Sequence, residues 1–136
     1  MRAVIDTCVV IDALEAREPF SDDAEKIMLA AADGKFEGVM TSASVLDIYR
    51  LIRHVPQAKG HTAKLLRLFD VCAVTREDEE KAVLSESEDF EAAVASEAAK
   101  RAGAEYIVTR DIDDFSRSEV EAVTPEDFLK ILHKEK

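Results

Sequence analysis

Several residue types that mark particular protein classes are scarce in this sequence. It has four glycines, three prolines and no tryptophan, which excludes a collagen-like or low-complexity chain. The two cysteines, Cys8 and Cys72, fit neither a disulfide framework nor a metal-ligand spacing, so we expect both to be small buried apolar residues in a reducing cytoplasm. The first residues lack the basic region and apolar stretch of a signal peptide, and no window approaches about 18 apolar residues. We therefore expect a cytoplasmic protein without a membrane span.

Basic residues are also in deficit. The 18 basic side chains face 29 acidic ones, giving a formal net charge of −11. This balance argues against a protein held on nucleic acid or on a membrane by its overall charge. It leaves open a local basic patch, or a site where bound cations reverse the sign. With 136 residues, 47% of them hydrophobic, the chain is long enough to bury a core, and we expect residues 1–136 to form a single domain.

Short β-branched runs alternate with longer helical patterns along the chain. The patterns predict strands over 3–5, 37–41, 71–74, 104–109 and 120–123, and helices over 21–33, 42–55, about 59–69, 76–87, 89–103 and 125–134. Ser21, Thr75 and Thr124 are the expected N-caps of three of these helices. Strands that alternate with helices of this length indicate βαβ units, and therefore an α/β protein with a parallel sheet in a three-layer α/β/α arrangement.

Carboxylates follow two of the predicted strands. Asp6 comes directly after the first strand, and Asp111 and Asp114 follow the fourth. Sites in open parallel sheets lie outside the carboxyl ends of the strands, so these acids converge if the two strands are neighbours. Crowded carboxylates repel one another unless a divalent cation is present, and oxygen ligands suit Mg²⁺ or Mn²⁺. Asp111 and Asp114 could equally be loop or turn residues, and we expect Asp12 on an outer helix.

Four segments in order resemble a PIN domain: VIDTCVVIDAL, EPFSDDAEKIM, TSASVLDIYRLIR, and DFEAAV with AGAEYIVTRDIDDF. The match runs nearly end to end and includes the closing VTPEDFLKIL. The resemblance is closest to the small stand-alone prokaryotic members, whose relatives include the VapC-type toxins of toxin–antitoxin pairs. It implies a three-layer fold with a parallel five-stranded sheet. It also implies a ribonuclease that depends on Mg²⁺ or Mn²⁺ and acts on single-stranded RNA, with a homodimeric state and an antitoxin as possible partner.

The resemblance assigns roles to individual acids. Asp6 matches the first acid of the family, and Asp111 and Asp114 match the acids after the fourth strand. Asp47 occupies a helix position where many members have Glu, and it would hold a metal-bound water or act as a base. Together Asp6, Asp47, Asp111 and Asp114 form the expected catalytic set.

One family position departs from the pattern. The usual third metal ligand falls at Ala92, which cannot bind a metal. Asp89 lies three residues earlier on the same helical face, and we take it as the substitute ligand beside Asp6, Asp111 and Asp114. Glu91 points about 100° away round the helix. The alternative is that this chain has lost part of its metal site and acts as a binding module for nucleic acid or protein.

Basic residues concentrate in one segment. Residues 48–69 contain five of them and no acid: Arg50, Arg53, Lys59, Lys64 and Arg67. The segment follows the helix that carries Asp47, so these side chains could contact RNA phosphates. Two solvated helix faces would give the same pattern. Thr7, Ser42 and Thr109 at strand ends could orient carboxylates, although we expect capping and local hydrogen bonds from them.

Overall fold

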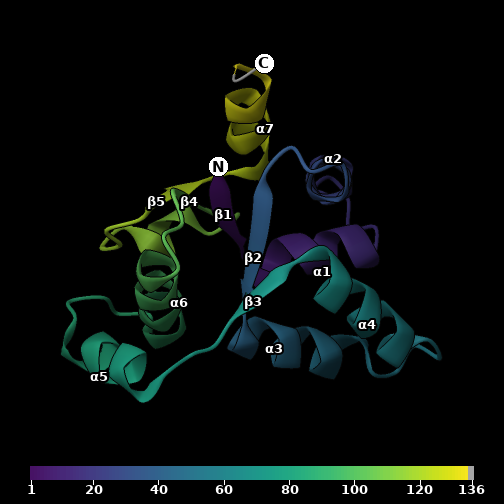
Figure 1. Cartoon of the computed structure of the whole chain (residues 1–136). Helices are drawn as coiled ribbons and strands as arrows, with labels where there is room; N and C mark the ends of the chain where they lie inside the picture. The colour runs from purple at the N-terminus through teal and green to yellow at the C-terminus, as the bar shows by residue number, and fades with distance from the viewer. Residues whose placement is uncertain (135–136) are drawn as a thin grey trace.

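The computed structural model describes residues 1–134 and contains a five-stranded, all-parallel sheet with the order β3-β2-β1-β4-β5 (Figure 1). The strands are β1 (Arg2–Ile5), β2 (Glu37–Thr41), β3 (Asp70–Cys72), β4 (Tyr106–Val108) and β5 (Glu121–Val123). The helices are α1 (Thr7–Leu14), α2 (Ser21–Ala32), α3 (Ser42–Ile52), α4 (Ala58–Leu68), α5 (Arg76–Leu84), α6 (Phe90–Arg101) and α7 (Pro125–Lys134). A 3₁₀ turn, η1 (Ile112–Phe115), follows β4.

The two faces of the sheet are covered by different helices. Successive side chains of a strand point to opposite faces. In β1, Ala3 and Ile5 accordingly belong to a core shared with α1 to α4 and α7, whereas Val4 packs with α6 and η1. The helix α5 packs against α6 on the outside of that second face (Figure 1). The predicted three-layer α/β/α fold is therefore confirmed.

The aromatic residue Phe128 anchors α7 to the first face. It is fully buried, and its ring meets that of Phe36 edge-on at 4.9 Å between centroids and that of Tyr106 at 6.2 Å. The prediction of this helix from Thr124 and Pro125 is confirmed, because the Thr124 hydroxyl accepts the Asp127 N–H at 3.1 Å.

Most predicted elements are present, with ends that differ by a few residues. Thr75 caps α5 as expected, in a reciprocal pair with Asp78. The predicted N-cap role of Ser21 is wrong. The helix α2 begins with Ser21 as its first residue and Phe20 at the N-cap position, and the Ser21 hydroxyl donates to Glu18 Oε1 at 3.0 Å instead.

Among residues 1–134, no helix is both long enough and apolar enough to cross a membrane.

Candidate metal centre

The strand order brings the predicted acids of two distant segments together. β1 and β4 are hydrogen-bonded neighbours, and the pairing continues one residue further, where the Asp6 N–H donates to the Val108 carbonyl at 3.0 Å. Asp6 is also the N-cap of α1, because its Oδ1 accepts the Thr7 N–H at 2.9 Å. A strand on one side and a helix on the other therefore fix the Asp6 carboxylate at the carboxyl edge of the sheet.

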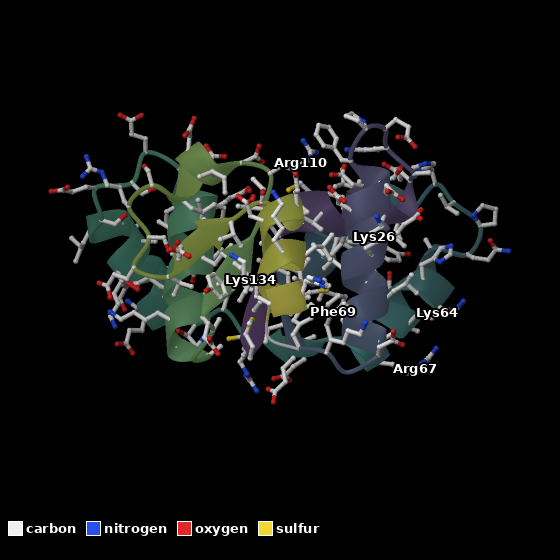
Figure 2. The ribbon with its side chains drawn as sticks, turned by 90° about the horizontal axis from the view of Figure 1, so that it is seen from above. Lys26, Lys64, Arg67, Phe69, Arg110 and Lys134 are labelled. Atoms are coloured by element: carbon white, nitrogen blue, oxygen red, sulfur yellow. The ribbon has the colours of Figure 1, made fainter. Side chains whose placement is uncertain are left out.

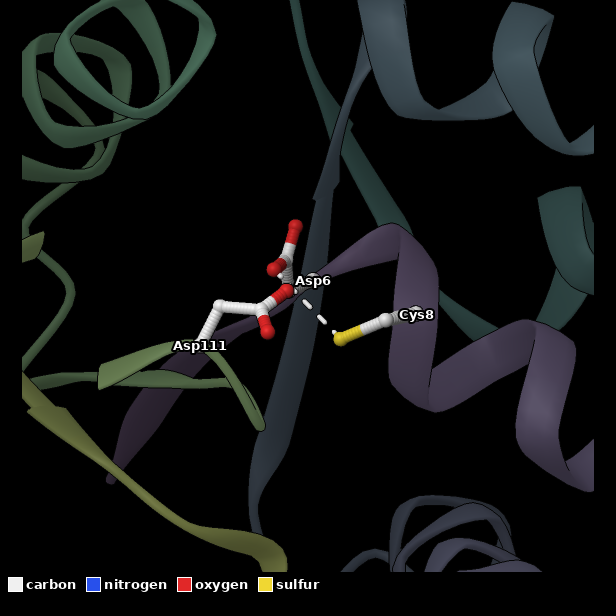
Figure 3. A group of neighbouring side chains, drawn as sticks. All are labelled: Asp6, Cys8 and Asp111. Carbon is white, nitrogen blue, oxygen red and sulfur yellow. Dashed lines mark hydrogen bonds between the residues drawn. The ribbon is translucent and has the colours of Figure 1, made fainter. Parts of the chain in front are cut away.

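Three side chains at this edge lie within reach of a single ion. Ligand atoms of Asp6, Cys8 and Asp111 are all within 4.8 Å of one another (Figure 3). Asp6 and Cys8 are half-buried, and Asp111 is exposed. In the part of the chain that the structure describes, no other trio of acidic, histidine or cysteine side chains meets this distance.

Thr109 contacts both acids of this group. Its side chain is fully buried, its hydroxyl donates to Asp6 Oδ2 at 2.8 Å, and its oxygen accepts the Asp111 N–H at 3.0 Å. One hydroxyl thereby links the first acid to the backbone of the second. Thr109 therefore has both roles considered from the sequence, since its bond to Asp6 orients a carboxylate and its bond to the Asp111 N–H is a local hydrogen bond.

Burial and crowding raise several pKa values at the centre. Burial raises the pKa of Asp6, with a smaller contribution from the charge of Asp111, while hydrogen bonds from Thr109, Thr7 and Cys8 act in the opposite direction. Burial, together with the charge of Asp6, raises the pKa of the Cys8 thiol to about 11. The pKa of Asp114 is raised by desolvation and by the charges of Asp89, Asp111 and Asp113. Burial is the largest of these effects, and neighbouring carboxylates add to it.

A cavity of about 630 Å³ opens over this group. Its acidic lining side chains come from five segments of the chain and are Asp6, Asp47, Glu79, Asp89, Glu91, Asp111 and Asp114. The basic lining side chains are Arg17 and Arg50. A cavity with this balance attracts cations more strongly than it attracts a bare phosphate.

The other predicted acids lie around the cavity in different settings. Asp47 lies on α3 and pairs with Arg50 at 3.1 Å. Asp89 is the N-cap of α6, because its Oδ1 accepts the Ala92 N–H at 3.0 Å, so it precedes the helix instead of lying one turn inside it. Ala92 is buried against the sheet and lines the cavity. Asp114 lies in η1 beside Asp89 and Asp111.

The basic residues of 48–69 divide between two locations. Arg50 lines the cavity together with Asp47. The other four, Arg53, Lys59, Lys64 and Arg67, are outside the cavity lining. Figure 2 shows Lys64 and Arg67 projecting from the outer side of α4.

Some residues of the site escaped the sequence analysis. Cys8 was expected to be a buried apolar residue, but its thiol donates to Asp6 Oδ2 at 3.6 Å. Its place two residues after Asp6, in the first turn of a helix at a strand end, is the signal that could have identified it. Arg17 lies in the connection between α1 and α2, and its sequence context gives no such signal.

Asp12 also differs from expectation. It lies on α1 but is 1% exposed, and Arg110 binds it through two hydrogen bonds, Nε to Oδ2 at 2.6 Å and a terminal nitrogen to Oδ1 at 3.2 Å. The Arg110 guanidinium also lies 4.1 Å from the centre of the Phe20 ring. This ion pair connects α1 to the residue immediately before Asp111.

Comparisons with known proteins agree with this geometry. The family model described as "PIN domain" matches residues 2–113, so the chain belongs to the PIN domain family. No curated protein sequence matches the chain.

Solved structures share the fold. A toxin–antitoxin complex from Klebsiella pneumoniae matches with a TM-score of 0.71 and 20% identity, covering 90% of this chain and 97% of that one. VapBC2 from Rickettsia felis, bound to a DNA fragment from its promoter, gives 0.63 and 12%, with 91% and 98% covered. VapC20 from Mycobacterium tuberculosis, a sarcin–ricin loop cleaving toxin, gives 0.61 and 16%, with 77% and 86% covered. At these identities the likeness is one of fold.

Proposed function

We propose that this PIN-domain chain is a metal-dependent ribonuclease that hydrolyses phosphodiester bonds of single-stranded RNA. The observation that carries the proposal is the convergence of Asp6 and Asp111 from neighbouring strand ends, in a cavity lined by further carboxylates.

The side chains present suit a hard divalent cation. Mg²⁺ and Mn²⁺ prefer carboxylate oxygens, which are the main donors at the centre. Burial, with a smaller contribution from the charge of Asp111, raises the pKa of Asp6, and a bound cation would favour its ionised form. We therefore assign Mg²⁺ or Mn²⁺ to Asp6 and Asp111, with Asp114 and Asp89 at the rim.

Each remaining residue has a role that follows from its contacts. When bound, the cation polarises the scissile phosphate and lowers the pKa of a bound water. Thr109 orients the Asp6 carboxylate and links it to the backbone of Asp111. Asp47, across the cavity on α3, is the carboxylate that would accept a proton from the attacking water.

The arginines of the cavity would hold the RNA. Arg17 and Arg50 are the lining residues that can contact phosphates next to the scissile bond. Arg53, Lys59, Lys64 and Arg67 lie outside the cavity and would contact phosphates further along the strand.

The structural relatives favour a toxin of a toxin–antitoxin pair. One is a toxin–antitoxin complex, another is a VapBC pair on promoter DNA, and a third is a toxin that cleaves the sarcin–ricin loop. We propose an antitoxin protein and a second copy of this chain as partners, and the cytoplasm as the location.

A second candidate is a PIN protein that binds RNA or protein without cleaving it. The observation in its favour is Ala92, where an apolar side chain packed against the sheet replaces a family ligand. Asp89 uses Oδ1 to cap α6, which leaves Oδ2 for a metal.

RNA cleavage separates the two candidates. Labelled single-stranded RNA and Mn²⁺ are incubated with one of four proteins: the wild type, Asp6→Asn, Asp111→Asn or Asp33→Asn. The Asp33→Asn variant is the matched control, because Asp33 is exposed and does not line the cavity. Cleavage by the wild type and by Asp33→Asn, with loss in the other two variants, supports the ribonuclease. Equal background from all four proteins, with RNA binding retained in a gel-shift assay, supports the binding module.

A further inference from the structure

We infer that Cys8 makes this centre a binding site for Zn²⁺, and that Zn²⁺ would displace Mg²⁺ or Mn²⁺ from it and so inhibit the chain. The inference deepens the proposed function, since it concerns the same metal centre. It rests on the position and the chemistry of one thiol that the proposed reaction does not require.

The Cys8 thiol lies where a zinc ligand would have to be. Its Sγ is 3.6 Å from Asp6 Oδ2. A tetrahedral Zn²⁺ with a sulfur ligand and an oxygen ligand holds these two atoms about 3.5 Å apart, given bond lengths of about 2.3 and 2.0 Å. Asp111 offers a carboxylate oxygen within 4.8 Å of the Cys8 sulfur and of an Asp6 carboxylate oxygen (Figure 3). Three ligands and one open position are the arrangement of catalytic zinc sites.

The hydrogen bonds at the centre allow Zn²⁺ to take the place of the Cys8 thiol proton. Asp6 uses Oδ1 to cap α1, so the oxygen that faces Cys8 is Oδ2, which accepts from the thiol and from the Thr109 hydroxyl. When Zn²⁺ binds, the thiol proton passes to solvent and the metal takes its place between sulfur and oxygen. The cap of α1 and the bond from Thr109 need not change.

Sulfur changes which ion is preferred. Mg²⁺ takes oxygen ligands, whereas a thiolate selects softer ions, and Zn²⁺ binds more tightly than Mn²⁺ to mixed ligand sets. A serine hydroxyl at position 8 would keep the hydrogen bond to Asp6 but remove this preference. Cys8→Ser is therefore the informative substitution.

The chain carries its own control thiol. Cys72 is half-buried like Cys8, but it lies at the end of β3, and its thiol donates to the backbone oxygens of Ala73 and Ala98 at 3.8 and 3.6 Å. Cys72→Ser removes a thiol of similar burial from outside the metal centre.

Cobalt spectroscopy tests the sulfur–metal bond without RNA. Co²⁺ is titrated into the purified chain, which carries no histidine tag, and the near-ultraviolet thiolate-to-cobalt absorption is recorded. We expect the band in the wild type and in Cys72→Ser, and its loss in Cys8→Ser, with circular dichroism showing that each variant is folded. An absent band in the wild type, or an unchanged band in Cys8→Ser, would overturn the inference.

Calorimetry and activity complete the test. Cys8→Ser should bind Zn²⁺ at least about tenfold more weakly than the wild type, while its Mn²⁺ affinity changes less. If the chain cleaves RNA with Mn²⁺, Zn²⁺ should inhibit the wild type and Cys72→Ser at lower concentration than Cys8→Ser. Equal Zn²⁺ affinities in all three proteins would refute the role of Cys8. A Cys8-dependent cobalt band in a chain that cleaves no RNA would refute the proposed function and the inhibition, and would leave the Cys8 metal site standing.

Discussion

Replacing Arg110 by methionine should destabilise the chain by about 3–5 kcal/mol, because it removes the partner of a buried carboxylate. Asp12 is 1% exposed and receives two hydrogen bonds from the Arg110 guanidinium. Methionine retains most of the apolar stem that lies near Phe20. The lost stability therefore measures mainly the effect of leaving the Asp12 carboxylate without its partner. Because the Arg110 side chain is 26% exposed, water can partly reach the site, and we expect a value near the lower limit.

The chain offers a matched ion pair as control. Arg101 binds Asp78 through two hydrogen bonds, and the Asp78 side chain is 4% exposed. Asp78 retains the Thr75 N–H as a second donor at 3.0 Å, and the Arg101 side chain is 43% exposed. Arg101→Met should therefore cost less, about 1.5–3 kcal/mol.

Urea unfolding in EDTA measures the change in unfolding free energy for Arg110→Met and for Arg101→Met. If the m-values are unchanged, the shifts in midpoint report changes in stability. The double variant Asp12→Asn/Arg110→Met should be more stable than Arg110→Met alone, because it removes the unpaired charge. A loss below about 1 kcal/mol for Arg110→Met, or a loss smaller than that of Arg101→Met, would contradict the reasoning.

Three further predictions concern the centre and the sheet. Burial holds the folded-state pKa of Asp6 above its ordinary value, so Asp6 lowers the stability of the metal-free chain as pH rises through that pKa. In EDTA at neutral pH, thermal melting should therefore show Asp6→Asn to be more stable than the wild type, and added Mn²⁺ should stabilise only the wild type; a less stable Asp6→Asn in EDTA would show that its hydrogen bonds outweigh burial. Thr109→Val removes a buried donor to Asp6 and should lower the free energy of unfolding in urea by about 1–3 kcal/mol. It should also weaken Mn²⁺ binding, measured by calorimetry, about 10–100-fold. An unchanged Mn²⁺ affinity would contradict the orienting role of Thr109. Gly38→Ala would bring a Cβ within 2.5 Å of the buried Phe69 ring (labelled in Figure 2) and should lower the free energy of unfolding by about 1–3 kcal/mol. Gly60→Ala on α4 meets open space and should be neutral or stabilising. Equal urea midpoints for the two variants would refute the packing argument.

Part of the site could be predicted from the sequence. Asp6 and Asp111 were expected at the ends of neighbouring parallel strands, and β1 and β4 do pair. Asp47 and Asp114 were expected to face the same site, and both line the cavity. Their roles in catalysis stay predictions, as do the phosphate contacts of the basic segment.

What the sequence alone determined is the local order of the chain. Apolar periodicity, N-cap residues such as Thr75 and the acids that follow two of the apolar strands depend on near neighbours, so they indicate the helices, the strands and the α/β class. The PIN-type motifs are local in the same sense.

Tertiary structure alone decided which side chains meet. Thr109 reaches Asp6, and Asp111 lies within reach of Asp6 and Cys8, because β1 and β4 are adjacent. Asp12 is buried because Arg110 comes from a segment about a hundred positions away, a separation over which no sequence period extends. A helical period specifies which residues share a face, but only the packed sheet determines what that face contacts.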